Sequence, residues 1–349
     1  MSDQLQNLDL PYFAIFLTFF LAVLSSLLVL APTQRGISAT WDYLKQVKFI
    51  ERNGIVVSTY IVIAVSLWVV VMIVAPQFFM VELSFHDGTV AADVNYDYSQ
   101  TPYTFNNYSY VIFGSGSDDS YFNVLHLKVF LRTIIASVCI TLLAFVLCYP
   151  IAYYMAQTAK GGTVRLLLIC LVLPFWVNEI LRAFAFRILF GSSGVINSVL
   201  IGSGIMDEPF DFIKADIAMY AGLSYAYILL MIFPIYNAIE SLDHNQIEAA
   251  RDLGSSWSRI HYRVVMPYAK PGIASGCTMV FMLTAGALAA PQILGGPSSL
   301  WFTQIITNWF NLGDWTRGSA YAFLFLLSCI VFVLTVMKYF KVNLGELAK

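Results

Sequence analysis

The sequence predicts an all-α protein that crosses a membrane several times, and three observations lead to this prediction. Seven segments approach or exceed about 20 mostly apolar residues, the length that a helix needs to cross the hydrocarbon core of a bilayer. Only 11% of the 349 residues are charged and 59% are hydrophobic, whereas a soluble domain carries about 25% charged residues. The mean hydropathy is +0.73. With so little polar surface, the chain must be solvated largely by lipid.

Each expected span is predicted to be a helix, because a helix satisfies every backbone polar group within its own segment. The strand alternation of a membrane barrel is absent. The first run follows a segment without Lys or Arg, so we interpret it as a retained span and not as a signal peptide. The expected spans cover residues 10–31, 55–81, 130–156, 165–190, 217–240, 271–293 and 318–338.

The distribution of Lys and Arg predicts the orientation. Basic residues concentrate in the short loops that remain in the cytoplasm. Here most of them fall in segments 32–54, 157–165 and 241–270 and in the C-terminal tail. These segments share one side of a seven-span arrangement, so we expect the N-terminus outside and the C-terminus in the cytoplasm. The long polar connection at 82–129 then lies outside.

Several function classes find no support in the composition. A net charge of −2 creates no field that would recruit nucleic acid. The five cysteines lie in apolar runs without metal-ligand spacing, so we interpret them as packing residues. The four histidines are divided between the outer connection and the 241–270 loop, which predicts no metal-bound active site. No Gly-x-x-x-x-Gly-Lys-Ser/Thr loop occurs, so we expect this chain to bind no ATP or other cofactor.

The polar segment 243–271, between the fifth and sixth expected spans, carries the signals of a folded structure. Asp243 and the glutamine three residues later have the spacing of a capping box, which predicts a helix from the next residue onward. Gly254 suits the left-handed turn that ends a helix, and either of the two serines after it can cap a second helix. Pro267 is acceptable near the start of a third helical stretch. We therefore expect a helix, a tight turn and a second helix lying across the membrane surface.

The same segment resembles the EAA loop of ATP-binding-cassette (ABC) importer permeases. That pattern is Glu-Ala-Ala, three residues, Gly, nine residues and Ile-x-Leu-Pro; here Val264 and Met266 replace Ile and Leu. In that family an ATPase subunit grips the membrane subunit at this loop. The resemblance implies this coupling role for Glu248, Ala249, Ala250, Asp252, Leu253, Gly254 and Pro267.

Other segments are similar to the polyamine (spermidine/putrescine) branch of these permeases. The matching segments are Tyr-Pro-Ile-Ala-Tyr-Tyr-Met-Ala at 149–156, Leu-Pro-Phe-Trp and its continuation at 173–189, and shorter stretches at 104–108, 194–197, 291–296 and 314–320. The resemblance implies a type I importer transmembrane domain over residues 55–349, with an external insert at 82–129 and the coupling loop at 243–271. This domain has a six-helix core, and residues 1–54 add an N-terminal transmembrane helix and a basic cytoplasmic segment.

The resemblance also implies an assembly in the bacterial inner membrane. Two permease subunits, here expected to be different chains, form a pair in the lipid bilayer. Two cytoplasmic ATP-binding subunits below them hold ATP and Mg²⁺, and a periplasmic solute-binding protein delivers substrate from above. The chain itself then catalyses no reaction.

Glu179 departs from the branch pattern, which more often has an uncharged residue there. An ionisable group at membrane depth is a functional candidate because its burial is costly. It either pairs with Arg182 on the same helix face or contacts a cationic substrate. The candidates for the substrate path are Trp176, Glu179, Tyr225 and Tyr227, although aromatic residues at helical spacing more often serve in packing.

The expected substrate is a polyamine or a related small cationic organic solute. The alternatives within the same importer class are ferric iron, an opine or amino-acid-like solute, and a betaine-like solute. A secondary transporter is a further alternative, which would predict interrupted helices or inverted repeats.

Overall fold

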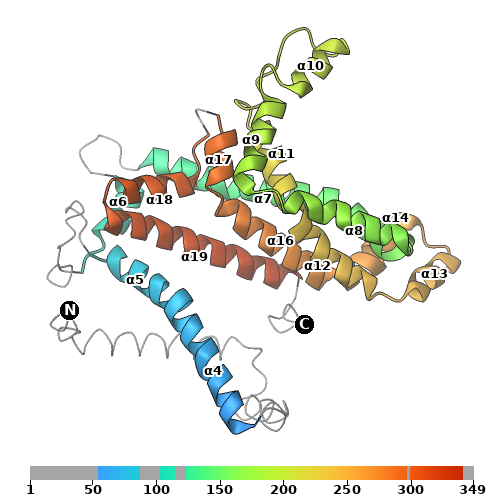
Figure 1. Cartoon of the computed structure of the whole chain (residues 1–349), viewed down its shortest axis with the longest axis horizontal. Helices are drawn as coiled ribbons and strands as arrows, with labels where there is room; N and C mark the ends of the chain where they lie inside the picture. Colours follow the sequence, from blue (N-terminus) through green and yellow to red (C-terminus); the bar gives the residue numbers. More distant parts are fainter. Residues whose placement is uncertain (1–53, 87–102, 115–122, 297–298, 341–349) are drawn as a thin grey trace. The chain divides into compact units, whose positions relative to one another are not determined.

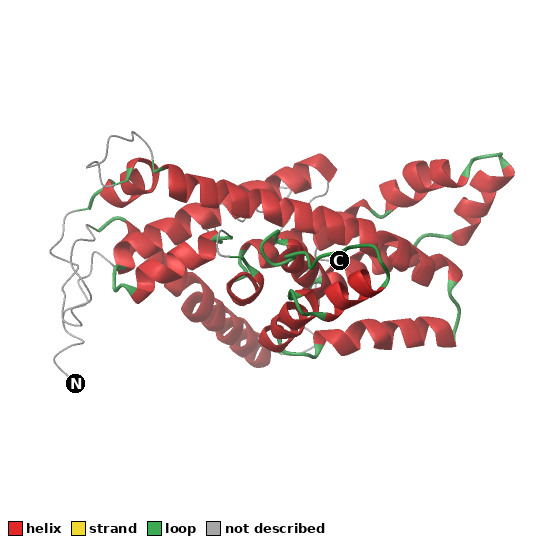
Figure 2. Ribbon diagram, turned by 90° about the horizontal axis from the view of Figure 1, so that it is seen from above, coloured by secondary structure: helices red, strands yellow, loops and turns green. Residues whose placement is uncertain are grey.

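The computed structural model describes residues 54–86, 103–114, 123–296 and 299–340. Figure 2 shows that these residues form helices joined by loops; within the described ranges the extended pairing is an isolated bridge between His86 and Tyr103. The predicted all-α class is confirmed. The expected span at 10–31 and the basic segment after it lie outside the described residues.

The first described segment is one apolar helical run. It consists of α4 (Ile55–Val69), the π-helical η1 (Val70–Val74) and α5 (Ala75–Ser84). The run Val56–Ser84 is long and apolar enough to cross a membrane, in agreement with the span expected at 55–81. Its residues up to Leu83 form a compact unit of their own.

The second unit begins at Ser84 and contains the other described helices. They are α6 (Asn106–Phe113), α7 (Val124–Tyr153), η3 (Tyr154–Thr158), α8 (Gly162–Phe175), α9 (Glu179–Phe190), α10 (Val195–Gly202), α11 (Ile217–Ala226), α12 (Ile228–Glu240), α13 (His244–Asp252), α14 (Trp257–Ile260), η4 (His261–Val265), α15 (Met266–Tyr268), α16 (Lys270–Ala285), α17 (Ala289–Leu294), α18 (Phe302–Asn311) and α19 (Trp315–Phe340). Its centre is a bundle in which α7, α12 and α16 pack against one another, with α19 along α16. In Figure 1, α13 and α14 lie at one end of this bundle and α6 and α18 at the other.

Small residues allow the central helices to approach closely, as is usual where helices meet in a membrane. On α7, Ala136, Ile140, Ala144 and Cys148 recur every four residues and are buried. On α16, a Cβ atom added to Gly272 would lie 2.3 Å from the carbonyl oxygen of Pro234 on α12. The contact between α12 and α16 is therefore one of backbone against backbone.

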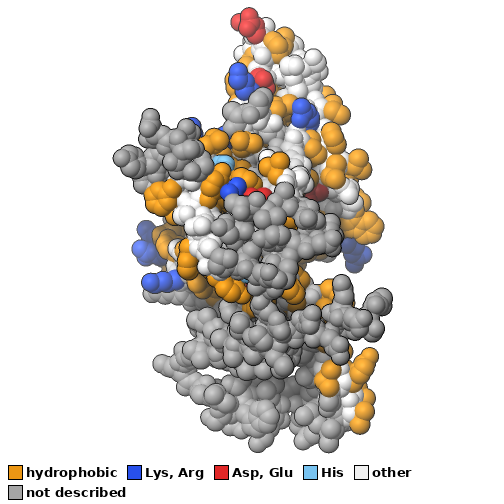
Figure 3. Space-filling view, turned by 90° about the vertical axis from the view of Figure 1, so that its left-hand side faces the viewer, with side chains coloured by type: hydrophobic (Ala, Val, Ile, Leu, Met, Phe, Trp, Pro, Cys, Tyr) orange, Lys and Arg blue, Asp and Glu red, His pale blue; other side chains and the backbone are white. Residues whose placement is uncertain are grey.

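Large apolar side chains also cover the outside of the described helices. Leu131, Ile135 and Leu142 of α7 are exposed, and Figure 3 shows hydrophobic side chains over much of the described surface on view. Within the described residues, four helices are long and apolar enough to cross a membrane, or five if α11 and α12 are one bent span. This surface is suited to lipid.

Three of the expected spans are wrong as continuous helices. The interruptions fall at residues 176–178 between α8 and α9, at Tyr227 between α11 and α12, and at residues 286–288 between α16 and α17. At Tyr227 the chain bends by 47°. Interrupted helices are the feature expected of the secondary-transporter alternative, so helix continuity does not separate the two classes.

The first interruption has a local cause. Pro174 has no N–H to donate to the preceding turn, and α8 ends one residue after it. The Asn178 side chain accepts a hydrogen bond from the Ile180 N–H at 2.9 Å, which starts α9. Beyond the three interruptions, α9, α11 and α17 pack together as a second group. Figure 1 shows α10 projecting from the end of α9, away from the bundle.

Part of the long connection at 82–129 is folded. Helix α6 packs on α7 and α19. The Asn107 amide nitrogen donates to the carbonyl oxygens of Ser84 and His86, at 3.0 and 2.6 Å, and so ties α6 to the first residues of the second unit. Helix α7 begins at Val124, six residues before the start expected from hydropathy.

We predict that Gly272→Ala destabilises the chain by about 1–3 kcal/mol, because the added methyl group would force α12 and α16 apart. Gly162→Ala at the start of α8 is the matched control, since a Cβ there meets nothing within 4 Å. Thermal unfolding of the detergent-purified variants measures the difference. Equal midpoints for the two variants would show that the helices do not meet at Gly272.

Candidate coupling loop and transport path

Helix α13 begins and ends as its sequence predicts. An Asp243 side-chain oxygen accepts a hydrogen bond from the Asn245 N–H at 3.0 Å and caps the N-terminus. At the other end Gly254 has a φ of +74°, in the left-handed region. The N–H of Ser255 donates to the Ala250 carbonyl oxygen at 3.1 Å, and the N–H of Gly254 donates to the Arg251 carbonyl oxygen at 2.9 Å. These two bonds form a complete Schellman motif.

The two faces of α13 have different roles. Ile247 is only 2% exposed and, with the partly buried Ala250, packs against the core of the bundle. The exposed face carries the remaining motif residues of this helix, including Leu253 at 87% exposure; they are Glu248, Ala249, Asp252 and Leu253. A partner can therefore contact Ala249, whereas Ala250 supports the helix from within.

Gln157, at the end of η3, joins α13 to the bundle. Its amide nitrogen donates to the carbonyl oxygen of Ile239 in the last turn of α12, at 2.9 Å, and to that of Leu242 just after the helix, at 3.3 Å. Its amide oxygen lies 3.0 Å from Nδ1 of His244. With the amide nitrogen assigned as donor, this oxygen accepts from a His244 Nδ1–H. Sequence reasoning missed Gln157, for which the one available signal is a polar side chain at the end of an apolar run.

His244 continues this connection to the motif. Its Nε2 atom lies 3.3 Å from a carboxylate oxygen of Glu248, one turn further along α13. Both side chains are more than half exposed, so this pair contributes at most a few tenths of a kcal/mol to stability. When the His244 imidazole is protonated, both of its ring nitrogens donate, and the ring then orients the Glu248 carboxylate along the exposed face of α13.

The second helix of the loop also starts at the expected place. Ser256 occupies the position before α14 without a side-chain cap bond, and the helix widens into η4 before Pro267 enters α15. His261 of η4 is 6% exposed, and its Nδ1 lies 2.9 Å from the Tyr149 hydroxyl. Burial lowers the pKa of His261 below its usual value. The neutral imidazole therefore fixes the loop to α7.

The transport-path candidates are brought together only in part. Trp176 is 83% exposed at the first interruption. Tyr227, at the second, is buried, and the charges of Glu179 and Arg182 lie within electrostatic reach of its hydroxyl. Tyr225 and Arg182 line a small cavity of about 130 Å³ between α8, α9 and the junction of α11 and α12.

The arginines near this site bind backbone carbonyl groups. Arg182 donates to the carbonyl oxygen of Pro174 at 3.4 Å, and Arg187 donates to that of Ile293 at the end of α17. Among the described residues no ion pair joins Arg182 to Glu179. The expected Glu179–Arg182 pair is thus not formed, and the Glu179 carboxylate remains available at the first interruption.

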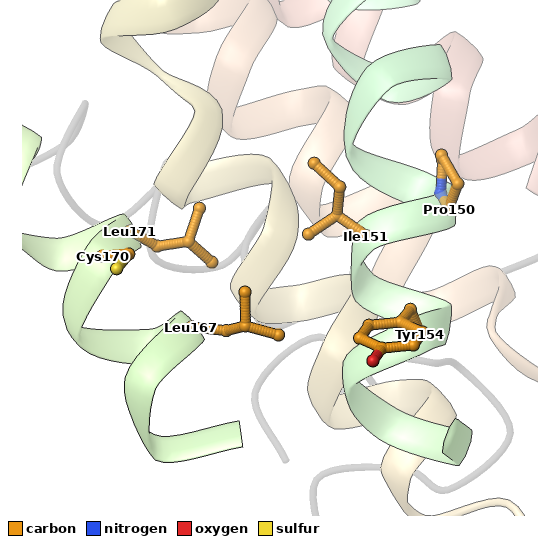
Figure 4. Close-up of a pocket in the computed structure, with 6 residues that line it drawn as sticks. All are labelled: Pro150, Ile151, Tyr154, Leu167, Cys170 and Leu171. Atoms are coloured by element: carbon orange, nitrogen blue, oxygen red, sulfur yellow. The ribbon is translucent and has the colours of Figure 1, made fainter. Parts of the chain in front are cut away.

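A cleft of about 430 Å³ lies between α7 and α8, and no charged side chain is among the described residues that line it. Figure 4 shows Leu167 and Leu171 of α8 facing Ile151 and Tyr154 across it. One thiol and one phenol are the polar side-chain groups in its walls. The cleft therefore offers no carboxylate to a cationic solute.

Sequence comparison places the chain among transport proteins. Residues 149–341 match the family described as binding-protein-dependent transport system inner membrane component. The chain is 30% identical over 279 residues to the spermidine/putrescine transport system permease protein PotB of Haemophilus influenzae, covering 79% of this chain and 90% of that protein. It is 31% identical over 255 residues to the PotB protein of Escherichia coli K12, covering 72% and 86%.

Solved structures show the same fold. A bacterial ABC transporter involved in the import of the acidic polysaccharide alginate has a chain that matches 85% of this one, with a TM-score of 0.62 and 15% identity. The same kind of transporter bound to a periplasmic protein with alginate pentasaccharide matches with a TM-score of 0.65 and 14% identity. The matches cover 98% and 99% of those chains, so the importer-type membrane fold is confirmed.

We predict that Gln157→Leu loosens α13, because it removes the hydrogen bonds to Ile239, Leu242 and His244. Each such bond contributes about 1 kcal/mol, so amide exchange in α13 should accelerate about tenfold or more. Hydrogen–deuterium exchange of the detergent-purified chain measures this rate. Gln246→Leu on the exposed side of α13 is the control and should leave it unchanged; equal rates in both variants would exclude the anchoring role.

Proposed function

We infer the function of this chain from the fact that it belongs to the binding-protein-dependent transport system inner membrane components. It is a multi-pass permease subunit of an ABC importer in the inner membrane. We propose that it carries a polyamine, or a related small organic cation, across that membrane. One observation carries the proposal: the same fold contains the exposed helix α13 of the coupling loop and an interrupted membrane helix that places the Glu179 carboxylate at its break.

In this proposal, α13 is the contact with a separate ATPase subunit. Its exposed Glu248, Asp252 and Leu253 present two carboxylates and an apolar anchor. The helix is held to the bundle by the buried Ile247 and by the hydrogen bond between His244 and Gln157. A helix held in this way moves as a unit with the bundle end, so closure of the ATPase is transmitted as a rigid-body displacement.

The proposed assembly follows from the position of α13 at one end of the bundle (Figure 1). The end of the bundle with α13 faces the cytoplasm, where two ATPase subunits bind ATP and Mg²⁺. A second permease chain completes the pathway, and a periplasmic binding protein delivers the solute at the opposite face. The C-terminus of the chain is then cytoplasmic, and an N-terminal span at 10–31 would place the N-terminus outside.

The substrate proposal rests on chemistry and on the named relatives. Two relatives are spermidine/putrescine permeases by name. In this chain Glu179 supplies a carboxylate at an interrupted helix, three residues after the aromatic Trp176 and within electrostatic reach of Tyr227. A carboxylate with aromatic rings suits an alkylammonium group, which binds by charge and by cation–π attraction. Selection of the solute is proposed to lie mainly with the binding protein.

We predict that Glu248→Arg lowers transport by about tenfold or more, because it replaces a charge-assisted contact of about 1.5–3 kcal/mol with repulsion. Gly254→Asp should act in the same direction by placing a charged side chain at the turn after α13. The measurement is ATP hydrolysis and solute uptake by the complete importer in proteoliposomes. Glu248→Gln is the graded control and should lose less.

Both variants should insert into the membrane, and the thermal midpoint of Glu248→Arg should stay near the wild-type value because this side chain is exposed. Gly254→Asp should in addition lose about 1 kcal/mol of stability, because Gly254 has a φ of +74° that an aspartate adopts only with strain. Undiminished uptake by both variants would contradict the coupling role of α13.

The substrate proposal predicts that the partner binding protein, purified from cells without added solute, carries a polyamine. Mass spectrometry of the extracted ligand makes the identification. Bound ferric iron, a betaine or an amino-acid-like solute would contradict the proposal while leaving the coupling role of α13 intact.

A further inference from the structure

An apolar groove lies between α7, α16 and α19, at the end of the bundle that carries α13. Its volume is about 660 Å³. Leu142 and Phe145 of α7, Ile273 and Cys277 of α16 and Phe332 of α19 form its hydrocarbon walls. The volume is within the range of sites that hold small molecules.

The polarity of the groove changes along its length. The basic and hydroxyl groups of Lys270, Tyr262 and Tyr339 lie where α16 begins and α19 approaches its end. Cys277 and Phe332 lie about two turns deeper, on the same two helices. Cys277 lies seven positions after Lys270 on α16, which is about 10 Å along a helix. That length covers most of one leaflet, since the whole hydrocarbon core is about 30 Å thick.

The charge at the mouth is positive. Lys270 is exposed, and no carboxylate occurs among the described residues that line the groove. No described side chain forms an ion pair with its ammonium group. Tyr262 and Tyr339 are also exposed, at 76% and 80%, and line the same groove, so their hydroxyl groups are accessible to a ligand bound there.

We propose that this groove binds an anionic phospholipid of the leaflet on the α13 side. An acyl chain occupies the hydrocarbon walls, and the phosphate lies against the ammonium group of Lys270 with hydroxyl donors from Tyr262 and Tyr339. Basic pockets between membrane helices favour anionic headgroups in this way. A zwitterionic lipid fits less well, because its headgroup brings a second ammonium group near Lys270.

The position of this site gives it a consequence beyond the coupling role proposed above. Met266 and Pro267, the last residues of the EAA-like motif, line the same groove. A lipid seated there touches the second half of the coupling loop while α13 remains free for another protein. The lipid therefore fills the space behind the loop and supports η4 and α15 against the bundle.

Native mass spectrometry of the detergent-purified full chain tests the proposal. The probes are phosphatidylglycerol and phosphatidylethanolamine of equal acyl length, each titrated separately. The wild-type chain should retain phosphatidylglycerol preferentially. Lys270→Gln should weaken that retention about fivefold, the factor that corresponds to about 1 kcal/mol per basic residue near an anionic lipid. Lys160→Gln, in the turn before α8 and outside the groove, is the matched control.

A second variant keeps the test independent of charge. Leu142→Trp fills the hydrocarbon part of the groove and should reduce the retention of both lipids, with Leu131→Trp at an exposed site on the same helix as its control. Unchanged phosphatidylglycerol retention in both Lys270→Gln and Leu142→Trp would overturn the proposal. Loss of association with a second permease chain in Leu142→Trp, with lipid retention unchanged, would assign the groove to that protein and likewise overturn it.

Discussion

The cost of leaving a backbone carbonyl group without a partner in a membrane governs the way this chain is built. Each interruption of a spanning helix frees such groups, and at two of the three interruptions side chains donate hydrogen bonds to them. At the break after α16, the Trp301 indole donates to the Ala285 carbonyl oxygen at 3.2 Å, and the Thr303 hydroxyl donates to that of Ala287 at 2.7 Å. At the break after α8, Arg182 donates to Pro174. These bonds stabilise bends that hydrocarbon alone would not tolerate.

The interruptions divide the helices of the second unit into two packed groups. The closely packed α7, α12 and α16 form a stiff bundle with α13 tied to its end through Gln157. Helices α9, α11 and α17 pack with one another beyond the breaks, where Glu179 and Tyr227 lie. We propose that a displacement of α13 reaches the interruptions through the bundle, because the close helix contacts at Gly272 leave little room for compression.

The sequence is most informative where local chemistry decides the structure. Asp243 and Gly254 define α13 because caps and left-handed turns depend on a few adjacent residues. The interruptions were not predictable in the same way: Pro174 is a breaker, but Tyr227 has no local signal, and its bend depends on tertiary packing. Gln157 and the inward side of Ala250 were missed for the same reason, since both depend on contacts between segments distant in sequence.

The central claim is that the exposed face of α13 is held rigidly by this chain and contacts a separate ATPase subunit. A photo-reactive amino acid incorporated at Ala249, in the complete importer in its native membrane, tests it most directly. Irradiation should join this chain to the ATP-binding subunit, whereas the same group at the exposed Ile205, after α10, should not. Equal adducts from both positions, or none from Ala249, would contradict the account.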